Sequence, residues 1–145
     1  MSLFSALSIS ASGMSAQRTR AELLTENLAN AETTRTADGG PYRRKDVVFQ
    51  SQGVSSPFAS ALTTAMGPDP AGVSVAEVVT DQGEPDRRYL PNHPDAGADG
   101  YVAFPRINPA EEMVDLMSAS RSYQANVASM SAVKDMILRS IDLLH

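Results

Sequence analysis

Apolar residues recur every seven positions in the last third of the chain. One row contains Leu116, Tyr123, Met130, Ile137 and Leu144. A second row, displaced by three or four residues, contains Met113, Ser120, Val127, Lys134 and Ile141. Two adjacent rows of this kind are typical of a helix that packs against another helix, as in a coiled coil. The pattern predicts a long helix in residues 108–145 with its seam along these rows.

Capping residues mark the start of this helix. Asn108 suits the N-cap, Pro109 suits the first helical position, and Glu111 suits the third, where a glutamate completes a capping box. A helix from there to the end of the chain would be about 50 Å long at ~1.5 Å per residue. Because a globule of 145 residues cannot cover that length, we expect part of its apolar surface to require other molecules.

The first 31 residues repeat the seven-residue spacing more weakly. One row contains Leu7, Met14, Ala21 and Leu28, and the other contains Leu3, Ser10, Gln17 and Leu24. Residues 5–16 are mostly Ser, Ala and Gly, which allow close approach of two backbones but bury little area. Leu3, Phe4 and Ile9 add apolar surface outside a single stripe. The pattern predicts a helix that is marginal alone and contacts more than one neighbour.

The middle of the chain differs from both ends. All nine prolines and eight of the nine glycines lie between Gly39 and Pro109. Strand-like runs occur at Tyr42–Phe49, Gly72–Thr80 and Gly100–Phe104, and a mobile loop is expected at about 50–70. We therefore predict an α+β protein in three parts: an N-terminal coiled-coil helix (1–31), a β-rich, irregular middle region (32–107) and a C-terminal coiled-coil helix (108–145).

Composition narrows the classes of function. The net charge is −5 and no part of the chain is strongly basic, so nucleic-acid binding is not expected. The chain has no cysteine, which excludes disulfides and thiolate metal sites. The first residues lack a basic region and a continuous apolar run, so neither a cleaved signal peptide nor a membrane span is expected.

Few residues in the sequence could form a catalytic or metal site. His93, Asp95 and Asp99 could form a metal or hydrolytic site, but the prolines around His93 favour a turn. No serine elbow, phosphate loop or apolar pair of carboxylates is present. The basic run Arg43–Lys45 divides between the two faces of a strand and favours a solvated or subunit-contacting strand. We expect no enzyme activity, no metal and no cofactor.

The end of the first helix, "ENLANAETTRT" at residues 26–36, carries more than a stop signal. Asn30 suits the left-handed conformation that ends many helices, and the threonines after it favour extended structure. Asn27 lies three residues before Asn30 on the same side of the last turn. A stop needs only Asn30, so we hypothesise that the two asparagines bond to a neighbouring chain and that the Thr-Thr-Arg-Thr exit fits adjacent subunits.

Four separated segments resemble the bacterial flagellar axial proteins. The terminal motifs of that family, Asn-Leu-Ala-Asn-x-x-Thr and Ala-x-Arg-x-Tyr-x-x-Asn, are present at 27–33 and 119–126. Residues 33–49 and 89–108 resemble the proximal rod subunits of the family, although "PRIN" at 105–108 and "PDAGADG" at 94–100 depart from the usual loops. The resemblance covers the chain except the segment near 50–70.

The resemblance implies a structural subunit of the flagellar rod, the periplasm-crossing drive shaft. Its implied partners are copies of itself, other proximal and distal rod subunits, the rod-to-membrane-ring adaptor and the flagellar type III export apparatus. The residues expected in the assembly interface are Leu3, Phe4, Leu7, Met14, Leu24, Asn27, Leu28, Asn30, Thr33, Met113, Leu116, Arg121, Tyr123, Asn126, Val127, Met130, Ile137, Ile141 and Leu144. The alternative is a soluble coiled-coil adaptor or export cofactor that does not polymerise, and a hydrolase using His93 is a more distant one.

Overall fold

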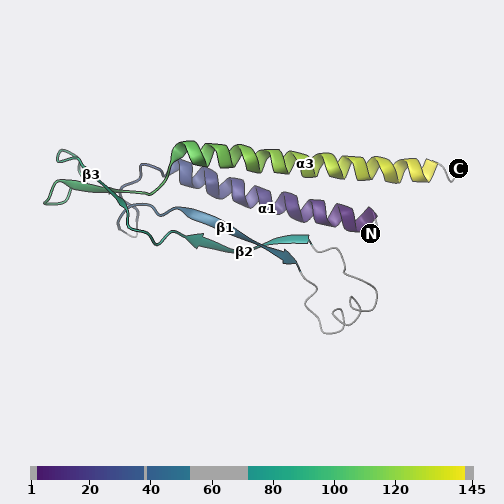
Figure 1. Ribbon diagram of the computed structural model, residues 1–145, viewed down its shortest axis with the longest axis horizontal. Helices are drawn as coiled ribbons and strands as arrows, with labels where there is room; N and C mark the ends of the chain where they lie inside the picture. Colours follow the sequence, from purple (N-terminus) through teal and green to yellow (C-terminus); the bar gives the residue numbers. More distant parts are fainter. Residues whose placement is uncertain (1–2, 38, 53–71, 143–145) are drawn as a thin grey trace, which may run out of the picture.

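Two long helices lie side by side and run in opposite directions. The computed structural model describes residues 3–37, 39–52 and 72–142. Helix α1 spans Leu3–Ala29 and helix α3 spans Pro109–Asp142. The end of α1 lies beside the start of α3, so both chain termini lie at the same end of the molecule (Figure 1). Since α3 has 34 residues and α1 has 27, α3 continues beyond the start of its partner.

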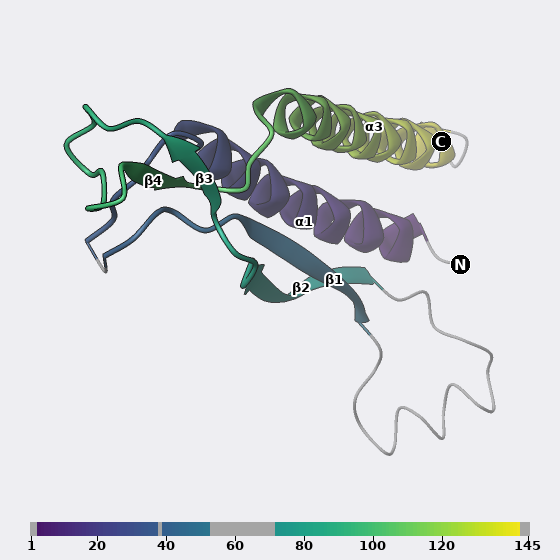
Figure 2. The same ribbon diagram turned by 60° about the vertical axis from the view of Figure 1, so that its left-hand side comes forward.

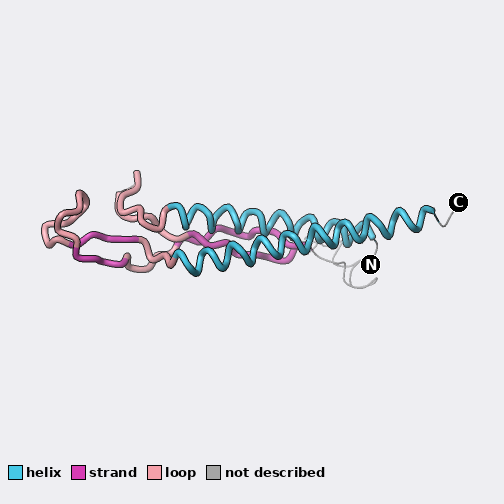
Figure 3. The backbone as a smooth tube through the Cα atoms, turned by 90° about the horizontal axis from the view of Figure 1, so that it is seen from above, coloured by secondary structure: helices cyan, strands magenta, loops and turns pink. Residues whose placement is uncertain are grey.

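The middle region forms two antiparallel strand pairs. Strands β1 (Lys45–Gln52) and β2 (Gly72–Thr80) make the longer pair, and β3 (Asp86–Tyr89) and β4 (Tyr101–Phe104) make the shorter one. The register of the first pair shifts between Val48 and Phe49, so β2 carries one extra residue at a β-bulge. The second pair lies beyond the helices, at the end opposite the chain termini (Figure 3).

Helix α1 is the central element of the fold. It packs on α3 along one side and on β1 and β2 along another, as Figure 2 shows. Among the described helices and strands, α3 contacts α1 alone. Among the residues of α1 from Ser5 onward, the exposed ones form a single stripe of small or polar side chains: Ser8, Ala11, Ser15, Arg18, Glu22, Thr25 and Ala29. The expectation that the first helix contacts more than one neighbour is therefore confirmed within the chain itself.

The fold class predicted from the sequence is confirmed, with corrections at the strands. The first strand was expected at 42–49 but begins at Lys45, because the preceding residues are held in contacts with the helices described below. The four-residue strand β3 was missed because "DRRY" has no alternating apolar pattern. The loop expected at about 50–70 lies mostly outside the described residues, and its first three residues are part of β1.

Both helix boundaries follow local side-chain chemistry. The Asn108 side chain accepts a hydrogen bond from the Ala110 backbone N–H at 3.1 Å, which confirms it as the N-cap of α3. At the other boundary, the expected left-handed conformation of Asn30 is wrong, since no non-glycine residue of the described chain has a positive φ. The Asn30 side-chain amide instead donates to the Glu26 carbonyl at 2.9 Å and its oxygen accepts from Thr33 Oγ1 at 3.1 Å. This side chain satisfies a terminal carbonyl directly, so no left-handed residue is needed.

Candidate functional site

A buried polar cluster joins three separated segments of the chain. At its centre is Asn27, near the end of α1, whose side chain is fully buried. Its amide donates to the Lys45 carbonyl at 2.8 Å and to Glu112 Oε2 at 3.2 Å. Its oxygen accepts from the Lys45 backbone N–H at 2.9 Å and from the Tyr42 hydroxyl at 3.1 Å. We call this cluster, comprising Asn27, Tyr42, Arg44, Lys45 and Glu112, the junction.

Glu112 anchors the start of α3 in the junction. Its side chain is 2% exposed and accepts a hydrogen bond from Arg44 Nε at 2.5 Å. This hydrogen bond, together with the charge of Glu112, raises the pKa of Arg44 above its ordinary value. A buried carboxylate is stable only when it is paired and hydrogen-bonded, and Glu112 meets both conditions. The start of α3 is therefore tied to α1 and to the chain entering β1.

Tyr42 closes the junction on the side of the loop that follows α1. Burial, with a smaller contribution from the negative charge of Glu26 and its hydrogen bond, raises the pKa of the Tyr42 hydroxyl to about 12. The hydroxyl stays protonated and can donate to Asn27 throughout the neutral range. Beside it, Lys45 Nζ forms an ion pair with Glu26 at 2.5 Å. The junction is thus a folded scaffold with satisfied polar groups and no free nucleophile or acid–base pair among its described residues.

Along the seam between α1 and α3, one predicted row on each helix is right and the other is displaced by one residue. Gln17 and Leu24 of α1 face α3, as does the row that includes Leu116. The second rows are instead Gly13, Arg20 and Asn27 on α1, and Glu112, Ala119, Asn126 and Val133 on α3. These rows consist mainly of small and polar residues, so hydrophobic periodicity could not reveal them.

Small and polar contacts set the spacing of the two helices. A side chain added at Gly13 would come within 3.0 Å of the Asn126 amide, so glycine lets α3 approach closely at this level. Nearer the junction, Arg20 pairs with Asp115 at 3.4 Å. Asn126, which the terminal motif singled out, therefore lies in the contact between the helices of one subunit.

The displaced row leaves apolar side chains of α3 exposed to solvent. Met113, Val127 and Ile141, which were predicted in the seam, are 53%, 42% and 49% exposed. Met117 and Leu138 lie on the same side of the helix and are 52% and 50% exposed. We call these five residues the outer row of α3. Exposed large apolar side chains at helical spacing mark a surface that packs against another molecule.

The remaining residues expected in the interface fall into four groups. Leu24 is buried, whereas a larger set is half-buried along the helices or at the end of α1: Leu7, Met14, Leu28, Asn30, Thr33, Leu116, Met130 and Ile137. Arg121 is exposed and Tyr123 is 41% exposed at the edge of the seam. The side chains of Leu3, Phe4 and Leu144 lie outside the described residues.

The hypothesis that Asn27 and Asn30 bond to a neighbouring chain requires correction at Asn27. Its amide and oxygen are all used within the subunit, and none of the side chain is exposed. Sequence reasoning also missed Arg44 and Glu112. The only signal for them was charge in unusual places: a basic run at the start of a strand, and two adjacent glutamates of which one must face the neighbouring helix.

His93, Asp95 and Asp99, the candidates for a catalytic site, form hydrogen bonds that stabilise turns and loops. His93 Nδ1 accepts a hydrogen bond from the Asp95 backbone N–H at 3.1 Å, and the Asp95 carboxylate accepts one from Thr34 Oγ1 at 2.7 Å. Asp99 accepts from the Tyr101 backbone N–H at 3.4 Å. Within the described residues, no three His, Cys, Asp or Glu side chains are grouped as metal ligands.

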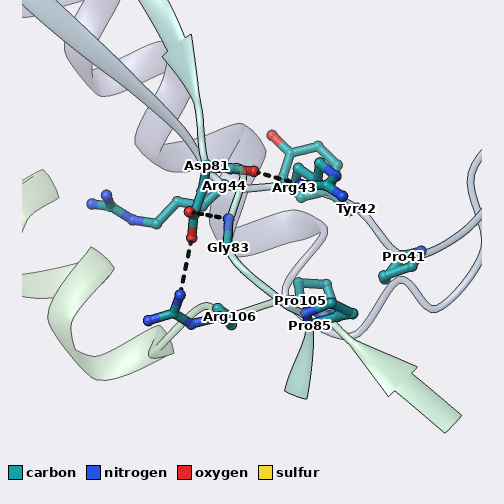
Figure 4. Close-up of a pocket in the computed structure, with 9 residues that line it drawn as sticks. All are labelled: Pro41, Tyr42, Arg43, Arg44, Asp81, Gly83, Pro85, Pro105 and Arg106. Carbon is teal, nitrogen blue, oxygen red and sulfur yellow. Dashed lines mark hydrogen bonds and ion pairs between the residues drawn. The ribbon is translucent and has the colours of Figure 1, made fainter. Parts of the chain in front are cut away.

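A small cavity near the junction is too narrow for a metabolite. It is lined by Arg43, Asp81, Gly83, Arg106 and neighbouring prolines, and its volume is about 50 Å³ (Figure 4). Asp81 holds its wall together by accepting from the Gly83 backbone N–H at 2.8 Å and pairing with Arg106 at 3.9 Å. Ligand pockets are usually about 300–1,000 Å³, so this cavity accommodates little more than water.

No helix in the described part of the chain is both long and apolar enough to cross a bilayer.

Comparison with known proteins places these features in context. Residues 98–143 match the family model described as flagellar basal body rod FlgEFG protein C-terminal. The chain is 42% identical to the flagellar basal-body rod protein FlgC of Bacillus subtilis over 150 residues, covering 99% of each chain. It is 41% identical to the protein of that name from Escherichia coli O6:H1 (99% and 98% covered) and 37% identical to that from Borreliella burgdorferi (100% and 99% covered).

Proposed function

The chain belongs to the FlgC family of flagellar basal-body rod proteins, and from this premise we propose that it is a self-assembling subunit of the proximal rod. Its family is one of structural proteins of the rod. In this proposal the subunit crosses to the periplasm without cleavage of a signal peptide, joins the growing rod, and transmits torque as part of the drive shaft.

The observation that carries this proposal is the outer row of α3. Met113 and Ile141 lie at opposite ends of this row, so the exposed apolar surface follows most of a 34-residue helix. An isolated soluble protein gains nothing from such a surface, whereas a subunit packed among other helices buries it. The junction supports this role because it fixes α3 against α1 and the β-rich region.

Energetics favour ordering of the helices during assembly. Full burial of a Met, Val, Leu or Ile side chain contributes about 1.5–3 kcal/mol, so the half-exposed outer row would gain roughly 1 kcal/mol per residue on docking. Fixing each backbone residue costs about 1–2 kcal/mol. One contact therefore offsets the ordering of only a few residues. In the proposed mechanism, the helix ends that bear the termini become fully ordered only when several neighbours surround the subunit.

The two ends of the helix pair differ in how well the single subunit holds them. Leu24, Asn27, Glu112 and Ala119 are buried near the junction, whereas residues 5–13 of α1 are mostly Ser, Ala and Gly with no fully buried side chain. We expect the free subunit to have reduced helicity, with hydrogen exchange fastest toward the ends that bear the termini. Uniform protection along both helices in the monomer would contradict ordering on assembly.

The proposed neighbours are copies of the chain itself, other proximal and distal rod subunits, and the adaptor between the rod and the membrane ring. The flagellar type III export apparatus would deliver the unfolded chain. Absence of cysteine fits this route, because no disulfide can lock the chain in a folded form before export.

The decisive experiment replaces the chromosomal gene by a tagged copy and isolates basal bodies. The tagged chain should be present in the rod fraction, and a density map should trace it there. Leu28→Asp places a charge at a half-buried position next to the seam, and Ile137→Asp places one at a half-buried position within it. Both should abolish incorporation, whereas charge changes within residues 55–65 should not. Motility at the normal level in either aspartate variant, or a tagged chain found only as small soluble oligomers, would favour the adaptor function instead.

A further inference from the structure

Two methionines begin the outer row of α3. Met113 and Met117 are 53% and 52% exposed. Since they are four residues apart in the helix, their thioether sulfurs lie on the same face, about one turn from each other. The junction holds this part of the helix in place, because Glu112, directly before Met113, is bound by Arg44 and Asn27. Both sulfurs are therefore open to reagents in solution while the helix around them is folded.

The composition of the chain makes these sulfurs prominent targets for oxidants. The sequence contains neither cysteine nor tryptophan, so no thiol competes with the thioethers for an oxidant. Among the described methionines, Met14 and Met130 are half-buried, whereas Met113, Met117 and Met136 are about half exposed. Because oxidation of sulfur follows its accessibility, an oxidant reaches the last three residues first.

The oxidation of a thioether transfers one oxygen atom. With hypochlorous acid, the sulfur attacks the oxygen with an electron pair, the S–O bond forms and the O–Cl bond breaks. Chloride leaves with both electrons of that bond and the hydroxyl proton passes to water, so sulfur loses two electrons and chlorine gains two. A peroxide reacts in the same way and leaves water. The product, methionine sulfoxide, is polar where the thioether was apolar, and burial of its oxygen without a hydrogen-bond donor is unfavourable.

Resting on the rod function proposed above, we propose that Met113 and Met117 form an oxidation site through which peroxides and hypohalous acids prevent incorporation of the subunit. Oxidation places two polar groups on a surface that must be apolar to pack, so the oxidised subunit is excluded from the rod. A methionine sulfoxide reductase reverses the block, because two thiols reduce the sulfoxide to the thioether, form a disulfide and release the oxygen as water.

Met136 provides a matched control for the effect of a polar group. It is 49% exposed, but it lies nine residues after Val127, which is two and a half turns at ~3.6 residues per turn and places it on the opposite side of α3. Glutamine is close to methionine sulfoxide in length and carries a polar oxygen near the end of its side chain. A tagged double variant, Met113→Gln with Met117→Gln, is therefore compared with tagged Met136→Gln in cells that lack the native gene.

We expect the double glutamine variant to have a ratio of rod-bound to total cellular chain about tenfold lower than the native chain, since its polar groups stay unpaired on packing. Met136→Gln should change this ratio less than about twofold, because surface substitutions away from a contact have small effects. Equal incorporation of the two variants would overturn the proposal.

Treatment with hypochlorous acid tests the chemistry itself. Peptide mass spectrometry of the purified full chain should show Met113 and Met117 oxidised at rates within about threefold of Met136, because their exposures are similar. If either residue of the pair were oxidised more than about tenfold slower than Met136, the sulfurs would not be accessible, and the proposal would be wrong.

A second double variant, Met113→Leu with Met117→Leu, keeps the outer row apolar and removes both sulfurs. Cells that produce tagged native or leucine chain are exposed to sublethal hypochlorite during its synthesis. Incorporation of the native chain should fall about fivefold more than that of the leucine variant, since only the native pair can be oxidised. Equal losses would contradict the proposed site. Absence of the untreated native chain from basal bodies would refute the proposed rod function, whereas the oxidation rates measured on the purified chain would be unaffected.

Discussion

Asn27→Ala removes the centre of the junction and should destabilise the subunit more than any conservative surface change. The substitution deletes two donated and two accepted hydrogen bonds at a side chain with no exposed surface. Glu112 keeps Arg44 as a partner, but the backbone N–H and carbonyl of Lys45 lose theirs. At about 1–3 kcal/mol for each buried group left unsatisfied, and with some access of water, we expect a loss of roughly 3 kcal/mol.

Thermal unfolding and hydrogen exchange measure this loss in complementary ways. For a chain of this size, roughly 3 kcal/mol corresponds to a decrease in Tm of about 10 °C. The Lys45 amide, which donates to Asn27, should exchange about 100-fold faster, since each 1.4 kcal/mol is about a factor of ten. The increase in exchange rate at Lys45 should exceed the increase at amides near the chain termini, because those amides exchange through local opening that does not involve the junction.

Two further variants separate the hydrogen bonds from the simple loss of a side chain. Thr25→Ala alters an exposed residue two positions earlier in α1 and should stay within about 0.5 kcal/mol of the native stability. Asn27→Asp keeps the shape and the acceptor but places a second carboxylate next to Glu112, so it should be at least as harmful as Asn27→Ala. If Asn27→Ala were as mild as Thr25→Ala, the junction would not hold the three segments together.

Three other predictions follow from the same contacts. Gly13→Ala should lower Tm despite the better helix propensity of alanine, because the added Cβ meets the Asn126 amide. Adding Asn126→Ala to the Gly13→Ala chain should restore stability. If the Tm changes of the two single variants simply add in the double variant, the close approach is contradicted. The pKa of Tyr42 is raised to about 12 from an unfolded value of 10.0, so its contribution is complete below pH 10 and is lost as pH rises toward 12. Urea unfolding between pH 9 and 11.5 should therefore show a steeper decline for the native chain than for Tyr42→Phe, and parallel declines would refute it. Arg44→Met should cost several kcal/mol because Glu112 is left as an unpaired buried charge, whereas the double variant Arg44→Met, Glu112→Met should recover much of the loss; a double variant as unstable as the single one would contradict this.

The helices could be predicted from the sequence because their signals are local. Asn108 and Pro109 define the start of α3 through contacts within a few residues. The row containing Leu116 and Ile137 follows from the 3.6-residue period of any α-helix. Local chemistry also located three of the four described strands. The strand it missed is β3, whose charged residues depend on a partner: Arg88 lies over the Phe104 ring at 4.6 Å across the pair.

The sequence by itself determined that two long helices flank a β-rich middle region along the chain and that one face of α3 carries more apolar surface than a single chain buries. Only the tertiary structure decided which residues meet. Asn27 and Glu112 are 85 positions apart, and nothing in their own neighbourhoods distinguishes a buried amide or carboxylate from a solvated one. Hydrophobic periodicity assigns apolar residues to the seam by default. In this protein, small and polar residues form half of that seam, because paired hydrogen bonds and a glycine allow closer contact there than bulky side chains would, and the displaced apolar row is left on the outside for other molecules.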